Sequence, residues 1–261
     1  MSKREIRGSR AMVTGASSGI GRALSQELAR QGAAVLMVAR REDRLRQTCE
    51  EIRQAGGQAE LVAGDVTDSL VRQQALETAQ ARFGGLDVLV NNAGVGASGR
   101  FDQADPQRLR RIMEVNFFAL AEMTRLALPL LKQGRRPIVV NVSSILGHRG
   151  VPYNSEYSAS KFAVQGFSEA LRAELSREGV DVLVVSPGTT RTEFFDRLLE
   201  RHGEPHWPEH GSVSPEYVAQ KIVRAIRQGR HEITPFWLGK VLCLLNRLSP
   251  RLVDRIMTRY V

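Results

Sequence analysis

The chain has 261 residues, of which 42% are hydrophobic and 25% are charged, as is typical of a globular protein with one large domain or two small ones. Its formal charge is +9, but the Lys and Arg residues are dispersed, so we expect a basic solvated surface and no nucleic-acid partner. No run approaches the roughly 18 apolar residues that would span a bilayer.

Two further features concern the compartment. The cysteines, Cys49 and Cys243, have neither the spacing of metal ligands nor that of a disulfide framework, which indicates a reducing compartment. Residues 1–10 are charged and lack the apolar segment of a signal peptide. We therefore expect a cytoplasmic protein without a metal site.

Short apolar runs alternate with helical patterns along the chain. Strands are expected at residues 10–14, 34–39, 59–63, 86–90, 138–142 and 181–185. Helices are expected between them, the longest at residues 106–132 and 154–177, and another follows at 215–228. This alternation predicts an α/β fold with a single doubly wound parallel sheet, Rossmann-like, and helices on both faces.

No linker or shift in composition divides the chain, so we expect one domain over residues 1–261. Its core would cover residues 8–230, and residues 231–261 would form a helical C-terminal extension. Residues 189–215 contain Gly, Pro and Trp with little periodicity, which predicts a long loop or lid.

A glycine-rich turn follows the first expected strand, at residues 14–21. Glycines permit a tight turn and let backbone N–H groups approach a pyrophosphate at the start of the next helix. The turn therefore predicts a dinucleotide site, formed by Gly15, Ser17, Ser18, Gly19, Ile20 and Gly21.

The tip of the second strand carries Arg40 and Arg41, whereas an NAD site would need a carboxylate there for the ribose 2′-hydroxyl. Two guanidinium groups suit a 2′-phosphate, so we expect NADP (NADPH), although a pair of solvated loop arginines is the alternative. Asp65 and Val66 follow the third strand, where the carboxylate can accept from an adenine amino group. Residues 91–94, Asn-Asn-Ala-Gly, follow the fourth strand at the same expected crevice.

Catalysis is indicated by Ser144, Tyr157 and Lys161. Tyr157 and Lys161 are four residues apart and would share one face of a helix, where the ammonium group would lower the pKa of the phenol. Ser144 adds a hydroxyl able to hold a substrate oxygen beside that phenol. Asn116, between Val115 and Phe117 in the long helix, predicts a partly buried amide that needs a partner.

Together these features resemble the short-chain dehydrogenase/reductase family over about residues 8–230. The matching pieces are Thr-Gly-x3-Gly-x-Gly at 14–21, Asn-Asn-Ala-Gly at 91–94, Asn116, Ser144, Tyr157-x3-Lys161 and Pro187-Gly188-x3-Thr192. The resemblance implies a catalytic tetrad of Asn116, Ser144, Tyr157 and Lys161, with Ser144 favoured over Ser143 because thirteen positions separate it from the tyrosine.

The resemblance also implies a role for each member of the site. Tyr157 would act as the general acid for carbonyl reduction and as the base for alcohol oxidation, and Lys161 would hold the nicotinamide ribose. Asn116 would hold a water in a proton relay. The dinucleotide would further contact Asn91, Asn92, Tyr157 and Lys161, and its nicotinamide end Pro187, Gly188, Thr190 and Thr192. Thr190 departs from the family, which usually has an aliphatic residue there.

The expected function is an NADP(H)-dependent oxidoreductase that interconverts a hydrophobic ketone or aldehyde and its alcohol. Two alternatives use the same fold: a non-catalytic NADP-binding sensor or scaffold, and a lyase or epimerase that employs the same tyrosine. The intact tetrad argues against the sensor.

The C-terminal tail lacks the Gly-Gly-ending strand common in tetrameric bacterial members, so we expect a homo-oligomer that is a dimer rather than a tetramer. Its apolar residues recur with helical spacing, at Trp237, Val241, Leu244, Leu245 and Leu248. This face would pack on its own domain or on a second subunit, or residues 235–261 would contact a membrane peripherally.

Overall fold

In a computed structural model of the chain, residues 4–201 and 212–260 are described. Within these residues seven strands form one parallel sheet in the order β3-β2-β1-β4-β5-β6-β7. The strands are β1 (Arg10–Thr14), β2 (Ala34–Ala39), β3 (Gln58–Ala63), β4 (Val88–Asn91), β5 (Ile138–Val142), β6 (Asp181–Val185) and β7 (Glu232–Ile233). The α-helices are α1 (Gly19–Arg30), α2 (Glu42–Gln54), α3 (Ser69–Phe83), α4 (Arg108–Met113), α5 (Ala119–Lys132), α6 (Ser155–Leu175), α7 (Pro215–Gln228), α8 (Trp237–Leu248) and α9 (Pro250–Met257).

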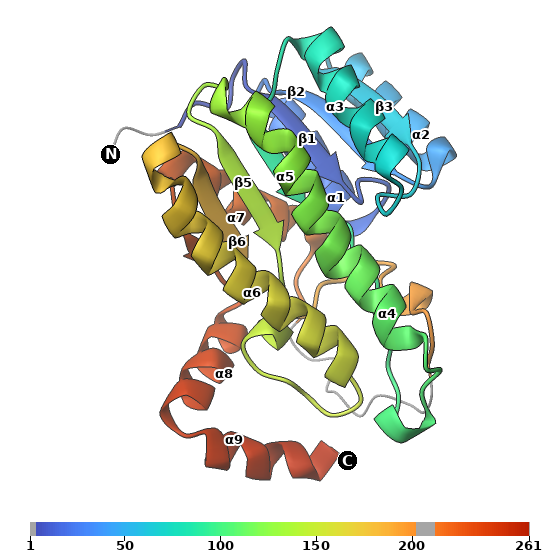
Figure 1. Cartoon of the computed structure of the whole chain (residues 1–261), viewed down its shortest axis with the longest axis vertical. Coiled ribbons are helices and arrows are strands. Elements are labelled where there is room, and N and C mark those ends of the chain that lie inside the picture. The colour runs from blue at the N-terminus through green and yellow to red at the C-terminus, as the bar shows by residue number, and fades with distance from the viewer. Residues whose placement is uncertain (1–3, 202–211, 261) are drawn as a thin grey trace.

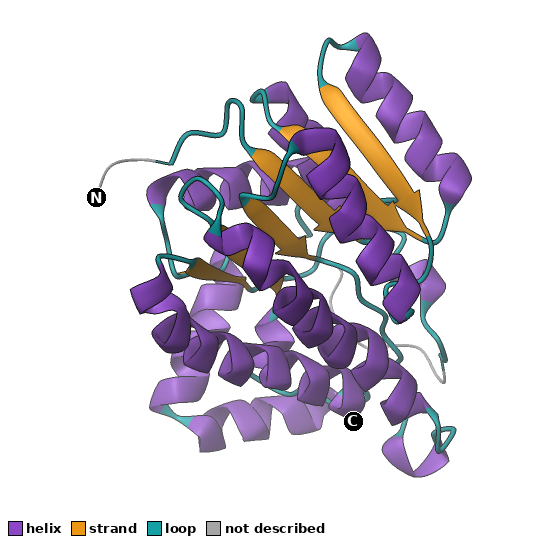
Figure 2. Cartoon of the chain, turned by 45° about the horizontal axis from the view of Figure 1, so that its top comes forward, coloured by secondary structure: helices purple, strands orange, loops and turns teal. Residues whose placement is uncertain are grey.

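The sheet is sandwiched between two layers of helices, as Figure 2 shows. Because successive strand residues point to opposite faces, Ala11 and Val13 of β1 enter one apolar core and Met12 enters the other. Helices α1, α2 and α7 complete the first core, and α3, α5 and α6 complete the second. The doubly wound α/β fold expected from the sequence is confirmed.

The long helix expected at residues 106–132 is interrupted. A π-helical turn, η2 (Glu114–Phe118), separates α4 from α5. The turn contains Asn116, whose amide bonds to a loop outside the helix. Periodicity alone did not reveal this break, because Ile112, Leu120 and Met123 are all buried and keep a helical spacing across it.

The C-terminal extension also differs from the expectation. It is not wholly helical, because Glu232 and Ile233 form the edge strand β7 beside β6. Two residues are too few to produce a recognisable apolar run, so this strand was not predicted. Helices α8 and α9 follow and lie beyond α6, far from α2 and α3 (Figure 1).

Because the sheet is parallel, the carboxyl ends of its strands meet at one edge. This edge carries Thr14 at the end of β1, Arg40 after β2, Asn91 at the end of β4, Ser144 after β5 and Pro187 after β6. Residues far apart in the sequence are thereby gathered around one crevice, the usual place for ligands in open α/β sheets. Part of the loop expected at 189–215, residues 202–211, lies outside the described residues.

Candidate active site

The glycine-rich turn between β1 and α1 is closely packed against the tip of β4. Thr14 Oγ1 accepts hydrogen bonds from the backbone N–H groups of Asn92 at 3.0 Å and Ala93 at 3.1 Å. The Asn92 side chain donates in return to the Thr14 carbonyl at 2.9 Å. The two strand tips therefore form one rigid unit.

Three glycines are required by this packing. Gly15 has φ +66°, and a Cβ there would lie 2.8 Å from the Cα of Ala93. A Cβ on Gly21 would overlap the Gly15 carbonyl and the Asn92 amide, and one on Gly19 would come within 3.0 Å of Thr192. The turn is thus a tight cradle in which these three positions have no room for a side chain.

Helix α1 begins at this cradle without a side-chain cap. Ser18 occupies the N-cap position but makes no capping hydrogen bond, whereas Asp68 of α3 and Ser214 of α7 each cap their helix. The first N–H groups of α1 and the positive end of its dipole therefore face the crevice, an arrangement that suits a phosphate group.

The two arginines after β2 lie beside the turn. Arg40 has an exposed side chain and faces Asp65 at 3.7 Å, a weak pairing that leaves most of its guanidinium donors in solvent. Arg41 donates to Ser17 at 3.3 Å and to Glu193 at 2.7 Å, so it bridges the glycine-rich turn and the segment after β6. Between the end of β2 at Ala39 and the start of α2 at Glu42, the chain carries two arginines and no carboxylate.

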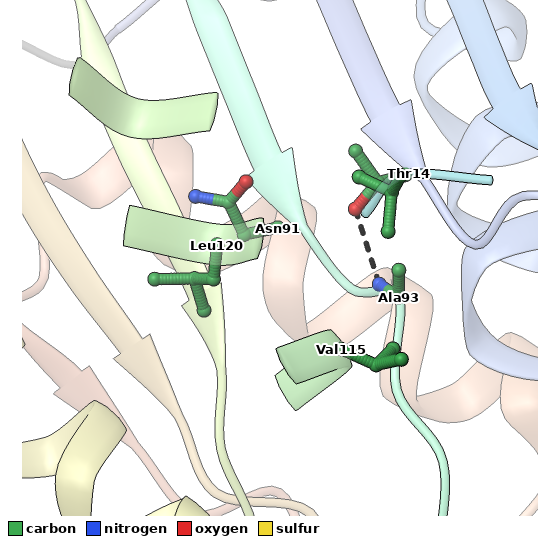
Figure 3. A pocket seen from close by; sticks show the side chains of 6 residues that line it. Thr14, Asn91, Ala93, Val115 and Leu120 are labelled. Carbon is green, nitrogen blue, oxygen red and sulfur yellow. Dashed lines mark hydrogen bonds between the residues drawn. The ribbon is translucent and has the colours of Figure 1, made fainter. Parts of the chain in front are cut away.

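Asp65 and Val66 lie in the loop after β3. Asp65 accepts hydrogen bonds from the backbone N–H and the hydroxyl of Thr67, which fixes the loop. Val66 is buried and lines a small hollow together with Thr14 and Asn91. This hollow, between the tips of β1 and β4 and helix α5, is shown in Figure 3 and is too narrow to admit a water molecule.

Asn91 and Asn92 point in different directions. Asn91 is buried and donates to Thr124 and Asn141, both at 2.9 Å, so its amide serves the interior between β4 and β5. Only Asn92 and the backbone after it face the glycine-rich turn. The amide nitrogen of Asn91 is therefore engaged in the interior, whereas its side-chain oxygen is buried without a hydrogen-bond partner among the described residues.

The two serines after β5 are distinguished by their partners. Ser143 Oγ donates to the backbone carbonyl of Lys161 at 3.0 Å, which ties β5 to α6. Ser144 Oγ accepts from Leu146 N–H at 3.1 Å and is hydrogen-bonded to the phenol of Tyr157. The structure therefore places Ser144, and not Ser143, beside the tyrosine, in agreement with the sequence spacing.

Tyr157 and Lys161 lie one turn apart on α6, and the Lys161 Nζ is 5.6 Å from the centre of the Tyr157 ring. Lys161 is 4% exposed, and its ammonium donates to the Val142 carbonyl at 3.0 Å. Burial raises the pKa of Tyr157 to about 12, although the hydrogen bond with Ser144 opposes this rise. Burial also lowers the pKa of Lys161 to about 8.

These two pKa shifts correct an expectation from the sequence. A lowered pKa was expected for Tyr157 because of the neighbouring ammonium, but burial raises this pKa, and the hydrogen bond with Ser144 opposes the rise only in part. The phenol therefore holds its proton at neutral pH, which is the state that a general acid requires.

Asn116 is fully buried in η2, rather than partly buried as expected. Its amide donates to the Val95 carbonyl and to Ser160 Oγ, both at 2.9 Å, and its carbonyl accepts from Val95 N–H at 2.8 Å. The π turn thus ties the chain after β4 to helix α6. Nothing in these contacts tests the proton-relay role of Asn116, which stays a prediction.

The segment after β6 closes the other side of the crevice. The Pro187 carbonyl accepts from Ile145 N–H at 3.0 Å, beside Ser144. Thr190 is buried, and its hydroxyl donates to the Gly188 carbonyl at 3.1 Å. The Thr192 side chain lies against Gly19, so this segment reaches back to the glycine-rich turn.

Sequence reasoning missed Phe194, whose ring lies 5.7 Å from that of Tyr157. Phe194 also packs on Phe195 and against Gly96, where a Cβ would be 2.8 Å from its ring. An aromatic wall therefore stands beside the Tyr157 phenol. The position of Phe194, two residues after Thr192 of the matched motif, was the available signal.

A buried ion cluster next to Tyr157 was also missed. Arg108 on α4 is 1% exposed and donates through Nε to Glu156 at 2.8 Å; its Nη1 lies 3.5 Å from Glu200. Glu156 directly precedes Tyr157, and Glu200 belongs to the segment after β6. The cluster thus holds the start of α6 against both sides of the crevice.

The chain is similar to known proteins over nearly its whole length. Residues 9–203 match the family model described as short chain dehydrogenase. The 3-ketodihydrosphingosine reductase of Bacteroides thetaiotaomicron is 39% identical over 92% of this chain and 84% of its own length. A short chain dehydrogenase/reductase from Burkholderia phymatum, solved in complex with NAD, superposes with a TM-score of 0.87 at 26% identity, over 95% of this chain and 96% of its own. A short chain dehydrogenase from Burkholderia cenocepacia J2315, solved in complex with NADP, superposes with a TM-score of 0.79 at 28% identity, over 88% of this chain and 97% of its own.

The parallel sheet, with its glycine-rich turn at the carboxyl edge, has the architecture of a Rossmann-like, nucleotide-binding protein. The chain belongs to the short-chain dehydrogenase/reductase family, and it is an oxidoreductase acting on CH–OH and C=O groups. Its residues fit a nicotinamide dinucleotide, because the glycine cradle has no room for side chains and the start of α1 lacks a side-chain cap.

Proposed function

We propose that this enzyme uses NADPH to reduce a hydrophobic ketone or aldehyde to the alcohol, and can catalyse the reverse reaction. The observation that carries the proposal is the position of the buried Tyr157 phenol, beside Ser144, one helical turn from Lys161 and flanked by Phe194. A polar hydroxyl pair beside an aromatic wall suits a carbonyl group on an apolar body.

The roles of the chain's own residues follow from their contacts. The hydroxyl of Ser144 orients the substrate oxygen, and Tyr157 donates its proton to that oxygen as negative charge develops there. Lys161, held by the Val142 carbonyl, lies close enough to stabilise the phenolate that remains. Asn116 would take part in returning a proton through a bound water. When bound, the nicotinamide supplies the hydride.

The dinucleotide would lie along the glycine cradle and the tips of β1, β2 and β4. Since solved relatives carry either NAD or NADP, the choice of NADP rests on this chain's own β2 tip. Arg40 has free donors in solvent and Arg41 already reaches the cradle, which favours a 2′-phosphate there.

Replacing Arg40 tests the choice of cofactor. Arg40→Asp puts a repelling carboxylate beside the 2′-phosphate, so the Kd for NADPH should rise by about tenfold or more while the Kd for NADH changes little. Arg224→Asp, which makes the same charge change at an exposed site on α7, is the control. Wild-type protein that binds NADH as tightly as NADPH in titration calorimetry would contradict the proposal.

The hydrophobic substrate is supported by two observations. Phe195 and Leu199 expose apolar surface on the same segment that carries Phe194. The relative from Bacteroides thetaiotaomicron is named for the reduction of a ketone, 3-ketodihydrosphingosine. We therefore expect a substrate whose carbonyl is attached to a long apolar chain.

The experiment is to follow absorbance of the reduced nicotinamide with ketones and aldehydes of increasing chain length. The ratio kcat/KM should increase with chain length if the aromatic wall binds the apolar part. Cofactor binding without any change in absorbance would favour a sensor or scaffold. Substrate conversion without net consumption of cofactor would favour a lyase or an epimerase.

We also retain the expectations of a homodimer and a cytoplasmic location. Both cysteines, Cys49 and Cys243, are free thiols, which is consistent with a reducing compartment. Among residues 4–201 and 212–260, no helix combines the length and the apolar character needed to cross a membrane. Sedimentation equilibrium of the full-length chain would measure its oligomeric state.

A further inference from the structure

Exposed apolar surface is concentrated on the last two α-helices. Half of the large hydrophobic residues that are exposed in the described part of the chain belong to α8 and α9. They are Trp237, Leu238, Val241, Leu244, Leu245, Leu248, Leu252 and Ile256. Leu248 is 72% exposed and Trp237 is 66% exposed, values that are unusual for such side chains in a folded protein.

The opposite side of these helices is already packed. Gly239 lies so close to Ile145 that a Cβ there would be 2.7 Å from its side chain. Val253 and Met257 of α9 are buried in a small core with Val151. The inner face therefore docks on residues 145–151, between Ser144 and Tyr157, and the outer apolar residues are not needed for that contact.

Polar contacts fix the same inner side. Arg149 donates to Asp254 at 2.6 Å and to Asn246 at 3.1 Å, and Asn246 donates to the His148 carbonyl at 3.1 Å. Phe236, just before α8, packs on Gly188 of the segment after β6. The tail is thus a fixed layer beside the crevice, with an outer face that no other described residue covers.

Basic residues border the outer face. Lys240 and Arg247 follow one edge of the exposed apolar stripe on α8, and Arg251 and Arg255 are exposed on α9. The acidic residues of the tail are engaged elsewhere, since Asp254 pairs with Arg149 and Glu232 lies 3.2 Å from His148. The exposed face therefore combines apolar residues with uncompensated positive charge.

The positive charge of the outer face distinguishes between two surfaces that could cover it, a second copy of the chain and an anionic lipid surface. A second copy that docked through the same face in a two-fold dimer would oppose basic residues to basic residues. An anionic lipid surface would bring opposite charge to the border and an apolar phase to the stripe. The observations therefore favour lipid over a second copy.

We propose that the outer face of α8 and α9 docks on an anionic lipid surface, from which the enzyme takes its long-chain carbonyl substrate. The source of the substrate rests on the proposed reductase function, whereas the docking itself does not. The contacts of Gly239 with Ile145 and of Phe236 with Gly188 place the docked helices directly beside the crevice. A lipid could then enter without crossing water.

Co-sedimentation with vesicles tests the docking. Full-length protein should bind vesicles of phosphatidylcholine mixed with phosphatidylglycerol, and binding should weaken in high salt and on pure phosphatidylcholine. The double variant Leu244→Ser/Leu248→Ser should lose binding by at least about tenfold. Leu70→Ser, at a leucine 71% exposed on α3, is the matched control and should bind as the wild type does.

A spectroscopic measurement locates the contact. The sequence contains two tryptophans, so a Trp207→Phe variant leaves Trp237 as the only indole. Its emission should shift to the blue on addition of the anionic vesicles and should be quenched by brominated lipid. An unchanged emission spectrum with vesicles present would overturn the docking of this face.

The outcomes separate the docking from the reductase activity. The double variant should reduce a short, water-soluble ketone at the wild-type rate and should slow only with a long-chain ketone presented in vesicles. Equal, negligible vesicle binding by wild type and variant would overturn the docking while leaving the reductase intact. Dissociation of a wild-type dimer by the same substitutions, without vesicle binding, would show that a second copy covers the face. Vesicle binding without ketone reduction would refute the proposed reductase alone.

Discussion

Helices α6 and α8 flank the same loop, residues 145–151, yet each departs from the usual distribution of polar and apolar residues in the opposite sense. Helix α6 buries Ser160, Lys161 and Ser168, whereas α8 exposes most of its apolar residues and buries only Gly239. Burying an ammonium group costs stability, and an exposed stripe of leucines leaves apolar surface open to association or aggregation. Two opposite departures from the usual distribution of polar and apolar residues therefore border one loop, at the candidate active site and at the proposed lipid contact.

The largest effect is expected on the α6 side, at Tyr157. Tyr157→Phe removes the proton donor and keeps the ring, so kcat should fall by about 10²–10⁴-fold while the Kd for NADPH changes little. Steady-state kinetics and calorimetry measure the two quantities. Tyr217→Phe, at an exposed tyrosine on α7, is the control. A rate above about a tenth of the wild type would contradict the assignment.

The next largest effect is expected at the buried ion cluster of Arg108, Glu156 and Glu200, at the start of α6. Arg108→Met leaves the carboxylate of Glu156 buried and unpaired, which should lower the free energy of unfolding by about 3–5 kcal/mol. Urea denaturation measures this loss, and Arg125→Met, which breaks an exposed pair with Glu122, should have a much smaller effect. The double variant Arg108→Met/Glu156→Gln should recover part of the stability. No recovery would show that the loss comes from packing rather than from charge.

Lys161 should reveal the energetic cost of its burial. Its pKa is about 8 in the folded chain, against 10.5 as the ordinary value, so the unfolded chain binds more protons between these two pH values. Stability due to this group therefore increases with pH across that window. Lys161→Met should remove the dependence and raise the free energy of unfolding at neutral pH by up to about 3 kcal/mol, while activity is lost.

Urea denaturation of wild type and Lys161→Met between about pH 7.5 and about pH 9.5 checks this prediction. The difference in unfolding free energy between the two proteins should narrow as the pH rises. A difference that stays constant would mean that Lys161 is not a strained ammonium in the folded chain.

The smallest effect is expected on the outer face of α8. Leu248→Ser replaces a side chain that folding leaves in water, so the free energy of unfolding should change by less than about 0.5 kcal/mol. Leu242→Ser, on the inner face of the same helix, should destabilise the protein clearly more, because Leu242 packs on the core of Val151 and Val253. Equal losses at both positions would mean that the outer face is covered in the folded protein.

Much of the fold was predictable because its strands are short apolar runs bounded by glycine, and these were located to within two residues. The break at Asn116 was not predictable, because Asn116 bonds to Val95, twenty-one residues away, and the helical period continues across the break. Strand β7 is too short to produce a pattern. Local periodicity therefore located the elements but not the long-range contacts that modify them.

The positions of the candidate residues relative to one another were predictable where a spacing in the sequence determined them. Tyr157 and Lys161 are tied by one helical turn, and Ser144 by its distance along the chain. The raised pKa of Tyr157 was not predictable, because the desolvation that raises it depends on the folded surroundings. The sequence did not predict the roles of Phe194 and Arg108, because the residues that they contact lie on other elements.

Gly239 gives the tail an uneven tolerance to sequence change. Most positions of α8 face solvent and can vary in size without consequence for folding, but a methyl group at Gly239 would press on Ile145, the neighbour of Ser144. Random substitution on the exposed face of this helix should therefore leave the reduction of a short, water-soluble ketone unchanged, whereas substitution of Gly239 should reduce it. In a library of tail variants selected for activity, position 239 should remain glycine while its neighbours diversify.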